Sequence, residues 1–164
     1  MAVATGAEMT AVSAARGRRT ITAEDFFVAH FTTALEPDEL LTEVAFPAVK
    51  PGTGTAFEEM ARRHGDFAVV GVAATLHLDG GVIDEATVVL TGMGATPVRA
   101  TSAESALVGQ RPGAECFESA ASDAAAETDP PSDLHGTSAY RRHVAQILIQ
   151  RSLQRAVATI GAAP

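Results

Sequence analysis

Apolar and polar residues alternate in two short stretches of the first 50 residues, the pattern of half-buried β-strands. The first stretch runs from Met9 to Ala14, with a turn at residues 16–18, and the second runs from Thr42 to Phe46. Between them, Thr22 is placed to cap a short helix through Phe27, with Asp25 at the capping-box position. The first part of the chain is therefore predicted to be mainly extended.

The middle of the chain predicts an antiparallel meander. Residues 55–61 are predicted to be extended, whereas residues 67–78 are so uniformly apolar that their period does not distinguish helix from strand. The end of that segment decides for a strand, because residues 75–79 alternate and the Asp-Gly-Gly sequence at 79–81 is typical of a hairpin turn. The β-rich residues 82–93 follow it.

The last third predicts three helices. Thr101 or Ser102 would cap the first, with Gly109 at its end, and residues 114–128 form an Ala-rich second helix. The third would run over residues 138–160, capped by Thr137 or Ser138. We expect its buried stripe to hold Tyr140, Val144, Ile147, Leu148, Val157 and Ile160, with Arg141, Arg142, Arg151 and Arg155 mostly outside it.

Strands that precede helices, rather than alternate with them, indicate an α+β fold. We expect an antiparallel sheet of three to four strands packed against about three helices. A cluster of turn residues, Pro47, Pro51, Gly52 and Gly54, marks a linker and predicts a boundary near residue 52.

Composition narrows the class of protein. The 164 residues are 46% hydrophobic and 20% charged, without the run of about 18 apolar residues that a membrane span needs. The 12 basic and 20 acidic residues give a net charge of −8, which argues against nucleic acid as a partner. Cys116 is the single cysteine, so no internal disulfide forms, and a cytoplasmic location is expected.

Most of the candidate chemistry has a simpler structural explanation. His64, His77, His135 and His143 lack the spacing of a metal site. Gly92 and Gly94 lack the rest of a phosphate-binding loop and indicate a turn, and no nucleophile motif surrounds Ser138. The sequence therefore predicts no catalytic and no metal-ligating residue.

The charged segment Arg62-Arg63-His64-Gly65-Asp66 leaves two interpretations open. It could present Arg, His and Asp to a polar or anionic ligand. Alternatively, an Arg–Asp pair could merely neutralise charge where the next strand begins.

Five blocks of sequence, in this order, strongly resemble one known family. They are "RRTITAEDFF", "TTALEPDELLTEVAFP", "FEEMARRHGDFAVVGVAATLHLDGG", "GMGATPVRATSAESALVG" and "DLHGTSAYRRHVAQILIQRSL", and they span about residues 18 to 155. The chain resembles the medium, FAD-binding subunit of molybdenum hydroxylases, the family of xanthine dehydrogenase and aerobic carbon monoxide dehydrogenase. The resemblance implies that residues 1–51 close the FAD-binding domain and that residues 52–164 form the flavoprotein C-terminal domain.

The resemblance also implies an oxidoreductase function. In the family, a substrate is hydroxylated at a molybdopterin centre, and electrons pass through two [2Fe-2S] clusters to FAD and then to an acceptor. The implied partners are a large molybdenum subunit, which would determine the substrate, and a small iron–sulfur subunit. The alternative is a free-standing α+β module that binds subunits without redox activity.

The family pattern implies that the flavin faces six residues here: Phe57, Glu58, Arg62, Arg63, His64 and Asp66. Glu58 stands where some relatives have lysine. The glycine-rich loops that hold the FAD pyrophosphate have no counterpart in this sequence. We therefore expect a truncated or split subunit, inactive and without tightly held flavin when isolated, with a further chain as a candidate source of those loops. A yellow purified chain would contradict this expectation.

Overall fold

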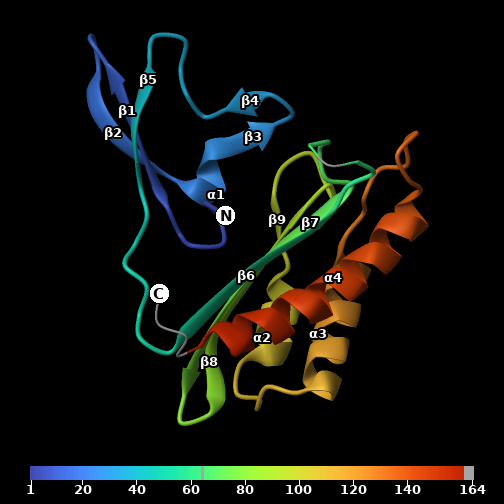
Figure 1. Cartoon of the computed structure of the whole chain (residues 1–164). Coiled ribbons are helices and arrows are strands. Elements are labelled where there is room, and N and C mark those ends of the chain that lie inside the picture. The colour runs from blue at the N-terminus through green and yellow to red at the C-terminus, as the bar shows by residue number, and fades with distance from the viewer. Residues whose placement is uncertain (64, 161–164) are drawn as a thin grey trace.

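The computed structural model describes residues 1–63 and 65–160 and has the predicted α+β architecture. Figure 1 shows two parts that are joined by an extended connection. The first part is mostly strands, and the second is a sheet with three helices on one face.

The N-terminal part is built on a three-stranded antiparallel sheet in the order β2-β1-β5. Its strands are β1 (Glu8–Ser13), β2 (Gly17–Thr22) and β5 (Leu40–Ala45). Thr22 caps the short helix α1 (Ala23–Phe26), as predicted, because its hydroxyl accepts a hydrogen bond from the Asp25 amide. A small hairpin of β3 (Phe27–Ala29) and β4 (Thr32–Thr33) follows.

The second part contains the predicted meander, a four-stranded sheet in the order β6-β7-β8-β9. The strands are β6 (Thr53–Met60), β7 (Val70–Asp79), β8 (Val82–Thr91) and β9 (Val98–Arg99), all antiparallel to their neighbours. Gly80 and Gly81 form the β7–β8 turn with positive φ, the conformation that this turn requires of its residues.

Three helices cover one face of this sheet. They are α2 (Thr101–Leu107), α3 (Ala114–Glu127) and α4 (Ser138–Thr159). Helix α4 packs on β6 and β7, α2 packs on β8, and α3 packs against the other two helices. Gly54 permits the close approach of α4, since a side chain there would overlap the carbonyl of Ala156.

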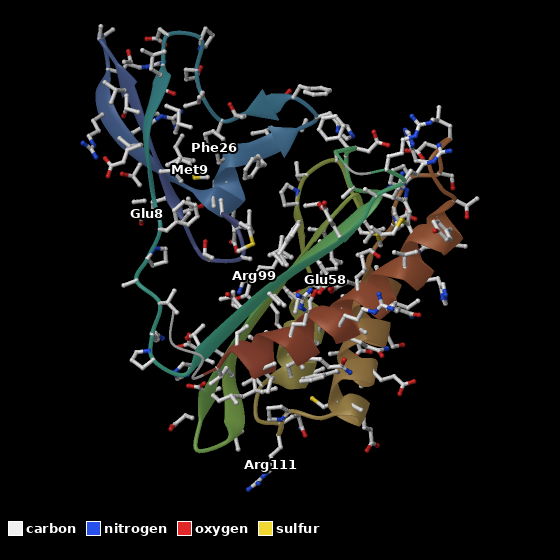
Figure 2. All side chains as sticks on the ribbon, in the orientation of Figure 1. Glu8, Met9, Phe26, Glu58, Arg99 and Arg111 are labelled. Carbon is white, nitrogen blue, oxygen red and sulfur yellow. The ribbon has the colours of Figure 1, made fainter. Side chains whose placement is uncertain are left out.

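The opposite face of the sheet is covered by the N-terminal part. Ala73 and Val89 belong to a buried cluster with residues of the N-terminal part, including Met9 and Phe26 (Figure 2). Val70, Val72, Ala74 and Leu76 face the helices instead. Strand β7 is thus buried on both sides, which explains why its sequence is uniformly apolar rather than alternating.

The structure corrects the predicted face of α4. Arg141, expected outside the buried stripe, is only 4% exposed, whereas Tyr140, expected in the core, is 45% exposed. The buried residues are Arg141, Val144, Ala145, Leu148, Ile149, Ser152, Leu153 and Ala156. Small residues form much of this stripe because α4 lies close to the sheet, so a stripe drawn through the large apolar residues alone is rotated from the real one.

The predicted caps have mixed outcomes. Thr137 caps α4 as expected, accepting a hydrogen bond from the Tyr140 amide. Neither Thr101 nor Ser102 caps α2, because that helix begins at Thr101 after Ala100, without a side-chain cap. Here Arg99 extends from β9 to the buried Glu104 side chain of α2, and both of its hydrogen bonds to that carboxylate come from Nε.

Across residues 1–63 and 65–160, none of the helices combines the length and the apolar character needed to cross a bilayer.

His77 holds the connection between the two parts. Its Nδ1 lies 2.5 Å from Asp84 Oδ1 and its Nε2 lies 3.0 Å from the carbonyl oxygen of Pro51. Both partners only accept hydrogen bonds, so the imidazole satisfies both when it is protonated. The hydrogen bond to Asp84 raises the pKa of His77, with smaller contributions from Pro51 and the charges of Asp84 and Glu85. Glu85 in turn pairs with Lys50.

We predict that this arrangement makes stability depend on pH. Because the folded-state pKa of His77 is raised, its contribution is complete below the ordinary histidine value of about 6.5 and is lost as pH rises through the raised pKa. The wild-type thermal midpoint should fall more than that of His77→Gln when pH is raised from about 6 to about 9. Parallel pH profiles for the two proteins would contradict the prediction.

Arg99 of the edge strand β9 joins the two parts. Its Nη1 lies 2.5 Å from Glu24 Oε1 of α1, and its Nε lies 2.9 Å from Glu104 Oε1 of α2. These two hydrogen bonds raise the pKa of Arg99, that to Glu104 most. Glu104 also accepts the Val88 amide.

We predict that Arg99→Gln destabilises the chain by about 1–3 kcal/mol, because it leaves the buried Glu104 carboxylate without its cation. The control is Arg111→Gln at an exposed position far from the N-terminal part (Figure 2), expected to change stability by less than about 0.5 kcal/mol. Urea unfolding followed by circular dichroism measures both. Equal urea midpoints for the two variants would show that the contact between the two parts of the chain does not depend on Arg99.

Candidate functional site

The charged loop (residues 61–69) connects β6 to β7 at one end of the sheet. Its ends are adjacent, since Met60 pairs with Val70 and the Val69 amide donates to the Met60 carbonyl at 2.8 Å. Gly65 has φ of +86°, a conformation that other residues adopt only with strain. His64, one of the predicted site residues, lies outside the described residues.

The side chains of this loop point into solvent. Arg62, Arg63 and Asp66 are exposed, and Phe67 is 99% exposed. Among the described residues, the side chains of Arg62, Arg63 and Asp66 make no ion pair or hydrogen bond with one another or with other residues. The Arg–Asp pair that was one of the two interpretations is therefore not formed between described residues, whereas groups that could meet a ligand are present.

A pocket of 420 Å³ lies against the loop. It is lined by Glu59, Ala61, Arg62, Arg63 and Gly65. Two guanidinium groups provide planar, permanently charged hydrogen-bond donors, which suit a carboxylate, a phosphate or another electron-rich polar edge.

Phe57 lies on the face of the sheet that meets the N-terminal part. Its register partner on β7 is Ala73, which pairs with Val89 on β8, and Val89 pairs with Arg99 on β9. These four residues form a row across the sheet, with the half-exposed phenyl ring at one end and the guanidinium at the other. The row is apolar in its middle and polar at one end.

Two adjoining pockets lie between this row and the N-terminal part. The smaller, of 60 Å³, is lined by Met1, Ala2, Val3, Phe27, Phe57, Ala73, Val89, Thr91 and Pro97. The larger, of 320 Å³, shares Val3, Phe27 and Pro97 with it and adds Glu24, Arg99 and Thr101. The site thus combines an apolar wall with charged groups near its edges.

Glu58 lies on the other face of β6, because successive strand residues point to opposite sides. Its side chain is 18% exposed and pairs with Arg155 of α4 (Figure 2 labels Glu58). The structure therefore separates Glu58 from Phe57, although the two were predicted to belong to one site. The alternation of strand β6 was the signal that could have separated them.

Sequence reasoning missed one residue that contacts the charged loop. Arg141 of α4, buried as described above, donates to the carbonyl of Val69, the last residue of the loop, at 2.5 Å. Its position three residues before Val144 and four before Ala145 was the available signal, since those spacings share a helix face.

Comparison with known proteins identifies two matching regions. Residues 55–156 match the CO dehydrogenase flavoprotein C-terminal domain, and residues 1–49 match the FAD binding domain in molybdopterin dehydrogenase.

Individual relatives agree with these matches. The chain is 35% identical over 143 residues to the 6-hydroxypseudooxynicotine dehydrogenase complex subunit alpha of Paenarthrobacter nicotinovorans, covering 87% of this chain and 48% of the relative. It is 34% identical over 140 residues to the carbon monoxide dehydrogenase medium chain of Hydrogenophaga pseudoflava, covering 85% and 49%. The chain thus spans about half the length of these relatives.

Solved structures share the fold. Carbon monoxide dehydrogenase from Hydrogenophaga pseudoflava, in a form that lacks the Mo-pyranopterin moiety, superposes with a TM-score of 0.92 at 34% identity, covering 98% of this chain and 55% of that one. Quinoline 2-oxidoreductase from Pseudomonas putida 86 gives 0.89 at 33% identity, covering 97% and 55%. With a family match across most of its sheet and helices, the chain belongs to the CO dehydrogenase flavoprotein C-terminal domain family.

Proposed function

We propose that this chain provides the flavin-facing surface of an FAD-binding subunit in a molybdenum hydroxylase complex. In that role it would carry electrons from [2Fe-2S] clusters through FAD to an acceptor. The observation that carries the proposal is the exposed Arg62–Arg63 pair, which makes no ion pair with described residues and stands on the β6–β7 loop of the matched flavoprotein domain.

The residues present fit the chemistry of a flavin. An isoalloxazine ring packs against apolar side chains, and the half-exposed Phe57 with Pro97 offers them beside the N-terminal part. Its electron-rich edge needs hydrogen-bond donors, and Arg62 and Arg63 offer several. FAD, when bound, supplies the capacity to take up two electrons and to release them again.

The residues of the charged loop would act by electrostatics. The positive charges of Arg62 and Arg63 favour negative charge on a neighbouring group, while Asp66 opposes them. His64 completes the proposed set. Glu58 would act indirectly, because its pairing with Arg155 fixes strand β6 against α4 and so orients Phe57 on the other face.

The proposal extends to organisation and partners. Residues 1–51 would close the FAD-binding domain and residues 52–164 would form the C-terminal flavoprotein domain, a division that the proline- and glycine-containing linker supports. The partners would be a large molybdopterin-containing subunit, a small subunit with [2Fe-2S] clusters and a further chain that supplies the glycine-rich FAD loops. The single cysteine supports a cytoplasmic location.

We predict that the double variant Arg62→Gln/Arg63→Gln weakens binding of oxidised FAD about tenfold, since it removes charge-assisted hydrogen bonds worth about 1.5 kcal/mol. The flavin reduction potential should fall by roughly 30 mV, because the more negative reduced flavin loses about 1.4 kcal/mol more than the oxidised form. Arg111→Gln, which removes one distant positive charge, is the control and should change neither. The measurements are FAD titration and redox potentiometry on the complex purified with its partner subunits.

Two results would count against the proposal. A wild-type complex that assembles without flavin would favour a subunit-binding module without redox activity. Equal FAD affinity and equal potential in the wild type and the double variant would remove the charged loop from the flavin site.

Phe57 and Glu58 provide a second test, because these neighbours face opposite sides of β6. Phe57→Ala should raise the FAD dissociation constant about fivefold to tenfold by removing aromatic contact. Glu58→Gln should leave it within about twofold, since its effect passes through Arg155. Equal losses of FAD affinity in both variants would show that FAD binding depends on strand β6 as a whole and not on the face that carries Phe57.

A further inference from the structure

Arg141 is an arginine buried in a helix stripe that otherwise consists of apolar and small residues. Its Nη1 donates to the carbonyl oxygens of Val69 at 2.5 Å and Gly92 at 3.1 Å. Its Nη2 lies 2.9 Å and 2.8 Å from the two carboxylate oxygens of Asp133. One side chain therefore contacts three separate segments of the chain.

Each of the three segments lies at the same end of the sheet. Val69 ends the charged loop, Gly92 follows β8, and Asp133 belongs to the turn that precedes α4. They are closely packed, since a side-chain carbon on Gly92 would overlap the carbonyl of Val69. Gly92 also has φ of +75°, which favours glycine. Thr91, the residue before Gly92, lines the pocket that contains Phe57.

The carboxylate of Asp133 is preorganised to receive Arg141. Its Oδ1 accepts the amides of His135 at 2.8 Å and Gly136 at 3.2 Å. These amides and the Arg141 guanidinium lower the pKa of Asp133, with the His135 amide contributing most. Asp133 and Gly136 also form a backbone bridge that closes the turn. The turn thus holds the Asp133 carboxylate on one side of the Arg141 guanidinium, and the carbonyls of Val69 and Gly92 lie on the other side.

Helix packing alone does not require an arginine here. Arg141 is buried whereas the Asp133 carboxylate is 41% exposed, and a buried charge of this kind can often be replaced by an apolar residue of similar volume with no loss of stability, because the charge must be desolvated. A planar guanidinium can instead bond a carboxylate with one nitrogen and backbone carbonyls with another, which an apolar side chain cannot do. By bonding both carbonyls, the arginine fixes the distance between Val69 and Gly92, the ends of two loops.

We propose that Arg141 is a positioning residue that sets the charged loop against the β8–β9 loop, so that Arg62 and Arg63 are held in a defined place relative to the Phe57 pocket. This inference rests on the proposed function, because it assigns the two loops to one flavin site. Arg141 itself is buried and acts through the backbone of Val69 and Gly92.

The test compares Arg141→Met with Arg142→Met in the complex purified with its partner subunits. Arg142 is a matched control, since it is the next residue of α4 and bonds the Thr128 carbonyl and Asp129, away from both loops. We expect Arg141→Met to speed amide hydrogen exchange about tenfold at Asp66 and Val69, the charged-loop amides that are hydrogen-bonded to Arg63 and Met60, and to leave exchange in β1 and β2 unchanged. Arg142→Met should leave the exchange of Asp66 and Val69 as in wild type.

The second readout is the flavin. Arg141→Met should raise the FAD dissociation constant about fivefold to tenfold and shift the flavin potential, while the control changes neither. Arg141→Lys, which keeps the charge but not the planar fork, should give intermediate values of exchange and affinity. This conservative variant also keeps the test decisive if Arg141→Met fails to fold.

The outcomes separate this inference from the function on which it rests. Unchanged loop exchange in Arg141→Met and Arg141→Lys would overturn the positioning role. Faster loop exchange with unchanged FAD affinity and potential would also overturn it, because the loops would then not be positioned for the flavin. A wild-type complex without flavin would instead overturn the proposed function, whatever the exchange shows.

Discussion

Burial of one sheet on both of its faces is the constraint on which the rest of this structure depends. The helices cover Val70, Val72 and Leu76 on one face, and the N-terminal part covers Ala73 and Val89 on the other. Removing either cover would expose apolar residues of the sheet to water and so destabilise it. The stability of the N-terminal part is therefore coupled to that of the sheet through β7 and β8, which carry Ala73 and Val89. Arg99 adds an ion pair with Glu24 of the N-terminal part, and His77 bonds Pro51 in the connection.

The same constraint decides where charge can gather. Strand β7 leaves no room for polar groups until its ends, so Arg62, Arg63 and Asp66 lie in the loop that precedes it, where they remain hydrated. This explains the abrupt change from charged to apolar residues near residue 67. The loop follows β6, the strand that carries Phe57 at the pocket between the two parts, a common location for ligand sites.

The fold could be predicted from the sequence where local signals dominate. The meander followed from the Asp-Gly-Gly turn, and the α4 start followed from Thr137 as a cap. Helical spacing to Val144 and Ala145 could have placed Arg141 on the buried face, but its bonds to two carbonyls that are 72 and 49 residues away in sequence could not be predicted in this way. The family resemblance grouped Phe57 and Glu58 in one site, whereas the sheet places them on opposite faces. Long-range contacts of this kind leave little trace in local spacing.

The arginines of this site carry the same charge but meet different physical demands. Arg62 and Arg63 stay in water, so their desolvation cost is small, and they can offer their donors to a ligand. Arg141 is buried, and its desolvation is offset by Asp133 and by two backbone carbonyls whose positions it then restricts. An exposed loop with a glycine and several charged residues has many accessible conformations. A ligand that binds only one of them loses affinity in proportion to the fraction of the population that the other conformations hold. Fixing the loop end through a buried charge reduces that loss while leaving the ligand-facing charges free.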